Sequence, residues 1–568
     1  MAEPRSLIQK SFKSLTPTYI GVGLLSLVIN LLMLTGPLYM LQIYDRVLAS
    51  GSVPTLLVIS VFALGMFIFY GVLDGLRQRI LARIGSWLDA KLTASVFDLS
   101  TALPLVLGPE ASKVRPVQDL DTIRNFMSGP GPSAMFDIPW LPVYLGLVYL
   151  FHPVLGNIAL AGVIIIFVLI LLKEYVSSKP ARDLVAASAE RQRLIEHGRV
   201  NAEAIQAMGM MNALKTRWEE KNSEFLNASQ NSSDSGANFG SFVRTIRMIL
   251  QSAMLGVGAY YAILQEISPG VMIAASIMTT RAFAPVEQAI GQWPLFVSAR
   301  QSRQRLSDLL SMRQNNDDVM NLPIPTKLLT VGNLSCGPAG LKKVVVQNIS
   351  FELSAGDGLG IIGPSGSGKS TLARALVGVT TIARGAVRFD GSKLDQWAMS
   401  RWGEIIGYLP QDIQLFDGTV SENISRFSLD ADADKIREAA SLANVHELIA
   451  ALPDGYNTVI GKSGFAMSAG QQQRIAFARA IYGKPFLIVL DEPNSNLDAE
   501  GEHALTNAIV KLRKAGSIVI VIAHRPSAIA AVDKILMVDK GMTKAFGPKA
   551  DVMAKVVAAV PDQKGASK

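Results

Sequence analysis

The chain has 568 residues, of which 49% are hydrophobic and 18% are charged, and its mean hydropathy is +0.30. The charged share lies below the roughly 25% of a soluble globular domain. The single cysteine, Cys336, excludes an intrachain disulfide framework and a zinc site built from several cysteines. The net charge of +8 would suit nucleic-acid binding, but the basic residues lie largely between apolar stretches, which favours membrane topology as its origin.

Six stretches are long and apolar enough to be predicted as membrane spans, each near the ~20 residues that a bilayer requires. They cover about residues 19–42, 54–76, 136–152, 155–173, 244–264 and 271–290. The first stretch is too long for a signal-peptide core and lacks a small-residue cleavage site, so it is interpreted as a span. The third and fourth spans meet at His152 and Pro153, which predicts a tight hairpin.

Lysine and arginine residues orient these spans. They gather in the N-terminal segment and in the two long gaps, 77–135 and 174–243, whereas the short gaps hold almost none beyond Arg46. By the positive-inside rule, both termini and both long loops are predicted to be cytoplasmic. The long loops are expected to continue the spans as helices, with a turn-rich break at residues 227–236.

The pattern divides the chain into four parts. We predict a cytoplasmic segment over 1–18, a transmembrane domain of six helices over 19–300, a linker over 301–327 and a cytoplasmic α/β domain over 328–568. Strands are expected in the last part, at about residues 343–346, 358–362, 486–490 and 518–522. The predicted fold class is a membrane α-helical domain followed by an α/β domain.

A phosphate-binding loop is predicted at residues 363–371, whose sequence GPSGSGKST follows an apolar strand and opens a helix. Such a loop wraps its backbone N–H groups around phosphates at the positive end of a helix dipole. Lys369 is expected to reach the β- and γ-phosphates, and Ser370 to hold Mg²⁺. A Gly-rich turn without a ligand is the alternative, which the complete pattern disfavours. The expected nucleotide contacts are Gly363, Pro364, Ser365, Gly366, Ser367, Gly368, Lys369, Ser370 and Thr371.

Two carboxylates end the apolar run that begins at Phe486. Asp491 is predicted to bind Mg²⁺. Glu492, expected on the other side of the pleat, is predicted to polarise the attacking water. An Asp-Glu pair after a strand is a weak signal alone, and it gains weight beside a phosphate loop.

With these motifs in place, the chain resembles the ATP-binding cassette (ABC) transporter family over nearly its whole length, in the layout of a type IV exporter half-transporter. Residues 467–471 (MSAGQ) are similar to the family signature, with departures at Met467 and Ala469. Gln411 matches the Q-loop and Asp498 ends a D-loop motif. His524 matches the switch histidine, although a lone histidine after a strand would ordinarily be interpreted as a solvated loop residue.

The resemblance implies that ATP and Mg²⁺ lie between the phosphate loop of one cassette and the signature of another. A second copy of the chain is the simplest partner, and a paralogous chain is the alternative because the signature departs from the family pattern. The aromatic residue that usually stacks on adenine has no counterpart in residues 334–340. The implied roles are catalysis by Glu492 and His524, nucleotide contacts from Gln411, Ser468, Gly470, Gln471 and Asp498, and Mg²⁺ ligands at Ser370, Gln411 and Asp491.

A finer resemblance is to the ATPases of bacterial type I protein secretion, in the alkaline-protease exporter branch. It rests on residues 36–46, 281–288, 407–412 and 491–499. It implies an inner-membrane exporter of unfolded proteins with C-terminal signals, working with a periplasmic membrane-fusion adaptor and an outer-membrane tunnel protein. The ~18 residues before the first span are too few for the peptidase domain of related exporters. A lipid or drug exporter is the alternative, whereas six spans within membrane lipid disfavour a soluble nucleic-acid-binding cassette protein.

Two further expectations concern the transmembrane domain. Residues 116–126 and 201–208 are similar in position to the helices that dock on the cassettes of related exporters, although plain cytoplasmic helix is the alternative. Arg281, within the sixth span, is predicted to line the transport pathway because a charge inside a span has a functional role by default. Snorkelling or pairing with Asp137 are the alternatives.

Overall fold

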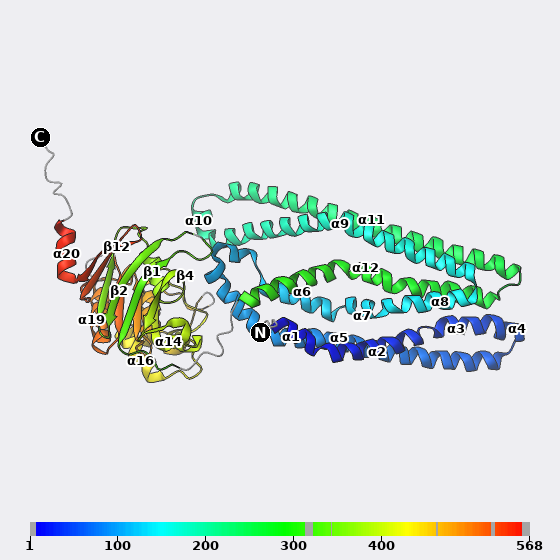
Figure 1. Ribbon diagram of the computed structural model, residues 1–568, viewed down its shortest axis with the longest axis horizontal. Coiled ribbons are helices and arrows are strands. Elements are labelled where there is room, and N and C mark those ends of the chain that lie inside the picture. Colours follow the sequence, from blue (N-terminus) through cyan, green and yellow to red (C-terminus); the bar gives the residue numbers. More distant parts are fainter. Residues whose placement is uncertain (1–6, 313–321, 342, 462–463, 524–528, 559–568) are drawn as a thin grey trace. The chain divides into compact units, whose positions relative to one another are not determined.

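The computed structural model describes residues 7–312, 322–341, 343–461, 464–523 and 529–558 (Figure 1). The chain forms two compact units, which are described separately. One comprises Met1–Phe97 and Pro116–Met312, and the other comprises Asp98–Arg115 and Arg313–Lys568. The predicted boundary at residue 300 therefore falls inside a helix, because α12 continues to Met312.

The described part of the first unit consists of helices. They are α1 (Leu7–Ser14), α2 (Thr16–Leu32), α3 (Thr35–Gln42), α4 (Leu48–Ser50), α5 (Val53–Leu107), α6 (Pro116–Ser128), α7 (Pro130–Asp137), α8 (Leu141–Phe151), α9 (Pro153–Val200), α10 (Ala202–Ala207), α11 (Met211–Ile263) and α12 (Pro269–Met312). The tight hairpin at His152 and Pro153 is confirmed, since α8 ends and α9 begins on either side of it.

Five helical stretches of the described chain are long and apolar enough to cross a membrane. They are Thr16–Ser50, Val53–Ser112, Pro130–Phe151, Pro153–Val200 and Met211–Ile263, which contain the first five predicted spans. The sixth predicted span lies in α12, which does not reach the same hydropathy and stays a prediction. α12 packs against α3, α6, α7, α8 and α11. Small side chains such as Ala274, Ala275 and Ala282 are buried in these contacts, as is typical of helix interfaces inside membranes.

The expectation that the long loops continue the spans as helices is confirmed by α5, α9 and α11. The predicted break at residues 227–236 is wrong, because α11 runs without interruption from Met211 to Ile263. α9 and α11 lie side by side along their length (Figure 1). These packing contacts sustain the helix where its own Asn- and Ser-rich sequence does not.

Of the two predicted docking segments, the first forms α6, and its docking stays a prediction. α6 packs against α12 through Asp119, whose carboxylate accepts hydrogen bonds from Ser302 and Arg305. Within the second unit, Gly108, which follows α5, lies so close to Ala339 that a Cβ on Gly108 would be 2.1 Å from the Ala339 carbonyl oxygen. The second segment does form a separate short helix, α10, between α9 and α11.

The second unit is an α/β domain with two main sheets. The larger has the order β12-β11-β3-β10-β9-β6, parallel except for β12, and the smaller is antiparallel with the order β2-β1-β4-β5. The strands are β1 (Leu328–Cys336), β2 (Val346–Ser354), β3 (Gly358–Ile362), β4 (Ile382–Phe389), β5 (Ser392–Lys393), β6 (Ile406–Leu409), β7 (Gly418–Thr419), β8 (Val459–Ile460), β9 (Leu487–Asp491), β10 (Ile518–Ile522), β11 (Lys534–Asp539) and β12 (Met542–Pro548). Three of the predicted strands are present as β3, β9 and β10, whereas the strand expected at residues 343–346 is misplaced, because β2 begins only at Val346.

Helices complete the core of the α/β domain. They are α13 (Lys369–Leu376), α14 (Trp402–Ile405), α15 (Val420–Ile424), α16 (Ala433–Leu442), α17 (His446–Ala450), α18 (Ala469–Ile481), α19 (Ala499–Lys514) and α20 (Lys549–Ala558). β9 and β10 are buried at every residue because both of their faces are covered. The parallel register aligns Ile361, Ile522 and Asp491 at the carboxyl ends of three neighbouring strands, the edge where ligands bind in open α/β sheets.

Candidate nucleotide site and a buried polar network

The phosphate loop connects β3 to α13. Gly366 and Gly368 have φ angles of 75° and 99°, which glycine adopts readily and other residues rarely do. A Cβ on Gly363 would lie 2.0 Å from the carbonyl oxygen of Val538, so the loop passes the neighbouring chain too closely for a side chain there. These glycines allow the backbone of the loop to curl in front of the helix N-terminus.

Lys369 points into this loop. Its Nζ donates hydrogen bonds to the carbonyl oxygens of Gly363 and Pro364, at 2.9 and 2.8 Å, and the residue is 5% exposed. Burial lowers the pKa of the ammonium group, while the charges of Glu492 and Asp491 oppose this shift. A buried cation inside a ring of backbone groups is well placed to bind phosphate oxygens.

Asp491 lies beside the first turn of α13 and is 2% exposed. Burial raises the pKa of this carboxyl, and a hydrogen bond with Ser370 opposes the rise. The Oδ1 atom is buried and has no hydrogen-bond partner among the described residues. An unsatisfied carboxylate oxygen next to a serine hydroxyl fits Mg²⁺, which takes oxygen ligands and is usually held by one or two carboxylates together with substrate phosphates and water.

Glu492 does not continue the pleat of β9, so that expectation is wrong. Its φ angle is 52°, a left-handed conformation that is costly for a residue other than glycine and that occurs preferentially at functional sites. Its backbone N–H donates to the carbonyl oxygen of Ile522 at 3.0 Å, which fixes this turn to β10. The half-buried Glu492 side chain lies within electrostatic range of Lys369.

Gln411 and His524 are the remaining residues predicted to act beside the phosphate loop. Gln411 is exposed and follows β6, whose Leu409 pairs with Leu490 next to Asp491. The strand register therefore brings the start of the Q-loop beside the carboxylates. His524 lies outside the described residues, two positions after the end of β10.

The signature residues form a second group, at the start of α18. Ser468 and Gln471 cap this helix reciprocally: the serine hydroxyl accepts from the Gln471 N–H, and the glutamine Oε1 accepts from the Ser468 N–H. Gly470 permits a close approach, since a Cβ there would be 2.9 Å from the carbonyl oxygen of Asn496. Met467 packs against the hydrophobic core and Ala469 is exposed, so neither departure disturbs the helix start.

Gln473, to which the sequence analysis assigned no role, joins the signature helix to the D-loop. It is 1% exposed; its Nε2 donates to the Pro493 carbonyl and its Oε1 accepts from the Asn496 N–H. Arg474 adds an ion pair with Asp498, 2.9 Å long. Asp498 also accepts from the Gly501 N–H, and this hydrogen bond lowers its pKa. A glutamine among the apolar positions of α18 was the available sequence signal.

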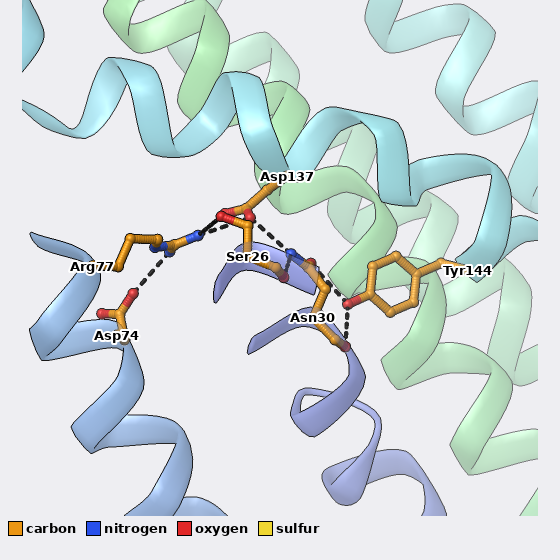
Figure 2. A network of polar contacts seen from close by, with 6 residues as sticks. All are labelled: Ser26, Asn30, Asp74, Arg77, Asp137 and Tyr144. Atoms are coloured by element: carbon orange, nitrogen blue, oxygen red, sulfur yellow. Dashed lines mark hydrogen bonds and ion pairs between the residues drawn. The ribbon is translucent and has the colours of Figure 1, made fainter. Parts of the chain in front are cut away.

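A buried ion-pair network lies in the helical unit, on residues of α2, α5, α7 and α8 (Figure 2). Arg77 of α5 is 4% exposed, and its guanidinium contacts Asp137 of α7 at 2.8 Å and Asp74 at 2.8 Å. The expected alternative that Asp137 pairs with Arg281 is therefore wrong. Arg281 is exposed and forms no ion pair with a described residue, so its role in a pathway stays a prediction.

Neutral groups complete the network (Figure 2). Asn30 of α2 donates from Nδ2 to Asp137 at 2.7 Å and to the Ser26 carbonyl at 2.8 Å. The hydroxyl of Tyr144, on α8, donates to the Asn30 carbonyl at 3.0 Å. The buried charges are thus paired and hydrogen-bonded, which offsets the high cost of ions in a membrane.

A helical membrane domain joined to this phosphate-loop domain defines the class of protein. The profile described as "ABC transporter" matches residues 346–495, and that described as "ABC transporter transmembrane region" matches residues 114–286. The chain belongs to the ABC transporter family, and the resemblance drawn from its motifs is confirmed.

Several relatives are similar over most of their length. The chain is 47% identical to "Type I secretion system ATP-binding protein PrsD" of Rhizobium meliloti (strain 1021), covering 95% of this chain and 93% of the relative. It is 28% identical to "Cyclolysin secretion/processing ATP-binding protein CyaB" of Bordetella pertussis, covering 94% and 75%. A bacterial Atm1-family ABC exporter solved with ATP bound has the same fold, with a TM-score of 0.78, 22% identity and coverage of 95% and 96%.

Proposed function

We propose that the chain is the ATP-hydrolysing transporter of a type I secretion system, which exports unfolded proteins with C-terminal signals. The observation that carries the ATPase part is the convergence of Lys369, Ser370 and Asp491 at the carboxyl edge of the sheet. The similarity to PrsD carries the protein-export part, because that relative is 47% identical over 95% of this chain.

We infer a role for each residue of the site. Lys369 exchanges its loop carbonyl partners for the β- and γ-phosphate oxygens of ATP. Ser370 and Asp491 would hold Mg²⁺, with Gln411 as the third expected ligand, and the ion would neutralise charge on the phosphates. Glu492, held in its strained turn, orients the attacking water and accepts its proton. His524 is proposed to contact the γ-phosphate.

The two separate groups of site residues support the hypothesis that two copies of the chain act together. The phosphate loop with its carboxylates is one half of a nucleotide site, and the signature with the D-loop is the other half. We infer that Ser468, Gly470 and Gln471 complete the site of a second copy, which places ATP between two cassettes. The periplasmic adaptor and the outer-membrane tunnel protein are proposed as further partners, on the similarity to type I secretion proteins.

The orientation belongs to the same proposal. The basic residues of the N-terminal segment and of the two long loops support cytoplasmic termini in a bacterial inner membrane. ATP is then available to the cassette, and the short outer connections face the adaptor.

The test compares secreted proteins from cells that carry the intact chain, Lys369→Ala or the control Lys435→Ala. Lys435 is an exposed lysine of α16 outside the site. We expect Lys369→Ala, and not the control, to retain one or a few proteins inside the cell. An unchanged set of secreted proteins under conditions of expression would contradict protein export and favour a lipid or drug exporter.

A further inference from the structure

A cavity of about 220 Å³ lies between α9, α11 and α12. Its walls combine apolar side chains, such as Leu169, Val243 and Ile290, with the charged side chains of Lys173, Arg244 and Glu287. The volume is many times the ~10–15 Å³ that holds one water molecule, which leaves room for a phosphate group.

The three helices are held together on one side of the cavity. Ile166, Leu250 and Phe283 are buried in a common cluster. Gly162 makes this contact close, since a Cβ there would be 2.7 Å from the ring of Phe283. The cavity residues follow this cluster along α9 and α12 and precede it along the antiparallel α11, so the cavity lies next to the cluster toward the ends of the spans that we propose to be cytoplasmic.

Basic groups outnumber acidic groups at this cavity. Arg247 pairs with Glu287 at 2.8 Å, and the other Glu287 oxygen accepts no hydrogen bond from the described residues. Arg244 donates from Nε to its own helix, at the Gly240 carbonyl, and shows no ion pair with a described residue. Lys173 likewise has no ion pair among the described residues. Lys173 and Arg244 therefore have no ion-pair partner among the residues that the structure describes.

We propose that this cavity binds the phosphate group of an anionic phospholipid, between Lys173 and Arg244. Basic pockets between membrane helices on the cytoplasmic side are suited to such headgroups. The apolar walls suit the glycerol and upper acyl chain, and the adjacent Val168 of α9 is 55% exposed in the single chain. The assignment to the cytoplasmic leaflet depends on the proposed orientation of the chain. The binding of the phosphate group does not depend on that orientation.

A bound phosphate would reduce the repulsion between the two cations and link α9 to α11. Binding to the folded state raises its stability by mass action. The full-length protein is therefore expected to melt at a higher temperature in bilayers that contain an anionic lipid.

The experiment places the full-length protein in nanodiscs of phosphatidylcholine, with or without phosphatidylglycerol. Thermal unfolding and native mass spectrometry report stabilisation and retained lipid for the intact chain, K173Q/R244Q, the charge-preserving K173R/R244K, and the control R193Q/R199Q. The control removes two exposed arginines of the same helix, α9, away from the cavity. We expect K173Q/R244Q to weaken phosphatidylglycerol retention about thirtyfold, which is about 2 kcal/mol at 1.4 kcal/mol per tenfold.

The charge-preserving variant and the control should retain the lipid as the intact chain does. Equal retention by K173Q/R244Q, in discs where it unfolds like the intact chain, would overturn the proposal. If K173Q/R244Q is less stable than the intact chain in phosphatidylcholine alone, Lys173 and Arg244 stabilise the fold without lipid, which would also contradict the proposal. If inorganic phosphate reproduces the stabilisation without phosphatidylglycerol, the lipid source is wrong. The binding readout does not involve export, so it stands whether or not secretion is found.

Discussion

The nucleotide site and the buried polar network of the helical unit are encoded in different ways. The phosphate loop occupies nine consecutive residues, 363–371, and works through backbone groups that a local glycine pattern shapes. The network takes single residues from helices separated in sequence, such as Asn30, Arg77 and Asp137 (Figure 2). A contiguous pattern thus reveals the first, whereas only the packing of helices reveals the second.

The two regions also differ in what their charges do. In the cassette, the buried Lys369 contacts only carbonyl oxygens of its own loop, and Oδ1 of the buried Asp491 has no hydrogen-bond partner among the described residues; we propose phosphates and Mg²⁺ as their partners. In the helical unit, Arg77 and Asp137 are paired with each other at 2.8 Å, and only Nε of the Arg77 guanidinium is without a hydrogen-bond partner among the described residues. Loss of a network charge should therefore reduce stability, and loss of a nucleotide-site charge should reduce the rate of hydrolysis.

Removal of Arg77 is the strongest test of this contrast. Arg77→Ala leaves Asp137 as a buried, uncompensated charge, which is expected to destabilise the helical unit by about 3–5 kcal/mol. Unfolding of the purified full-length chain in lipid measures the loss. The double change Arg77→Met with Asp137→Leu should recover most of it, because replacing both ions by apolar groups is often neutral. A loss below about 1 kcal/mol for the single change would show that the pair is not structural.

Lys369→Ala should have the opposite effect: a lower rate of ATP hydrolysis with little change in stability. Removing one charge-stabilising donor typically costs about 10²–10³ in rate, so ATP hydrolysis should fall by this factor. The unfolding temperature without nucleotide should stay close to that of the intact chain. Steady-state hydrolysis and thermal unfolding of the same preparation give both values. A large drop in stability with little change in rate would reverse the contrast.

Asp491→Asn tests the unsatisfied carboxylate. Burial raises the pKa of Asp491 in the folded chain, so folding favours the neutral acid, and its stabilising contribution is lost as pH rises through the raised pKa. The variant is therefore expected to be more stable than the intact chain at neutral pH without ligands, by about 1 kcal/mol. It should also lose the extra stabilisation that ATP gains from Mg²⁺. Unfolding with and without Mg²⁺ measures both, and undiminished Mg²⁺ stabilisation would exclude Asp491 as a ligand.

The smallest expected effect is that of Ala469→Gly, which removes one of the two departures from the family signature. Ala469 is exposed at the first turn of α18, so the change removes only a methyl group near the expected phosphate of a second copy. The hydrolysis rate should be preserved or raised, at a helix-propensity cost of up to about 1 kcal/mol. A large loss of rate would mean that this loop is built differently from the family pattern.

Sequence patterns predicted those features that depend on local order. The phosphate loop, β3, β10 and the position of Asp491 follow from short-range spacing and burial, and the structure has them as expected. The conformation of Glu492 was not predictable from strand alternation, because a hydrogen bond to Ile522 of the neighbouring strand fixes it.

The remaining differences arise from contacts across the fold. The unbroken α11 depends on α9 beside it, and the buried Gln473 depends on the loop at Pro493. The partner of Asp137 depends on which face of α5 meets α7, which neither hydropathy nor motif spacing specifies. In each case residues distant in sequence decide the outcome.

The most direct measurement is the rate of ATP hydrolysis by purified Glu492→Gln protein in lipid, with its bound nucleotide and oligomeric state. The carboxylate at the end of β9 is proposed to activate water in a site shared by two copies. The variant is therefore predicted to bind ATP, to turn over at least about 10²-fold more slowly, and to accumulate as a closed pair of chains with ATP retained. Hydrolysis at the rate of the intact chain would contradict this assignment.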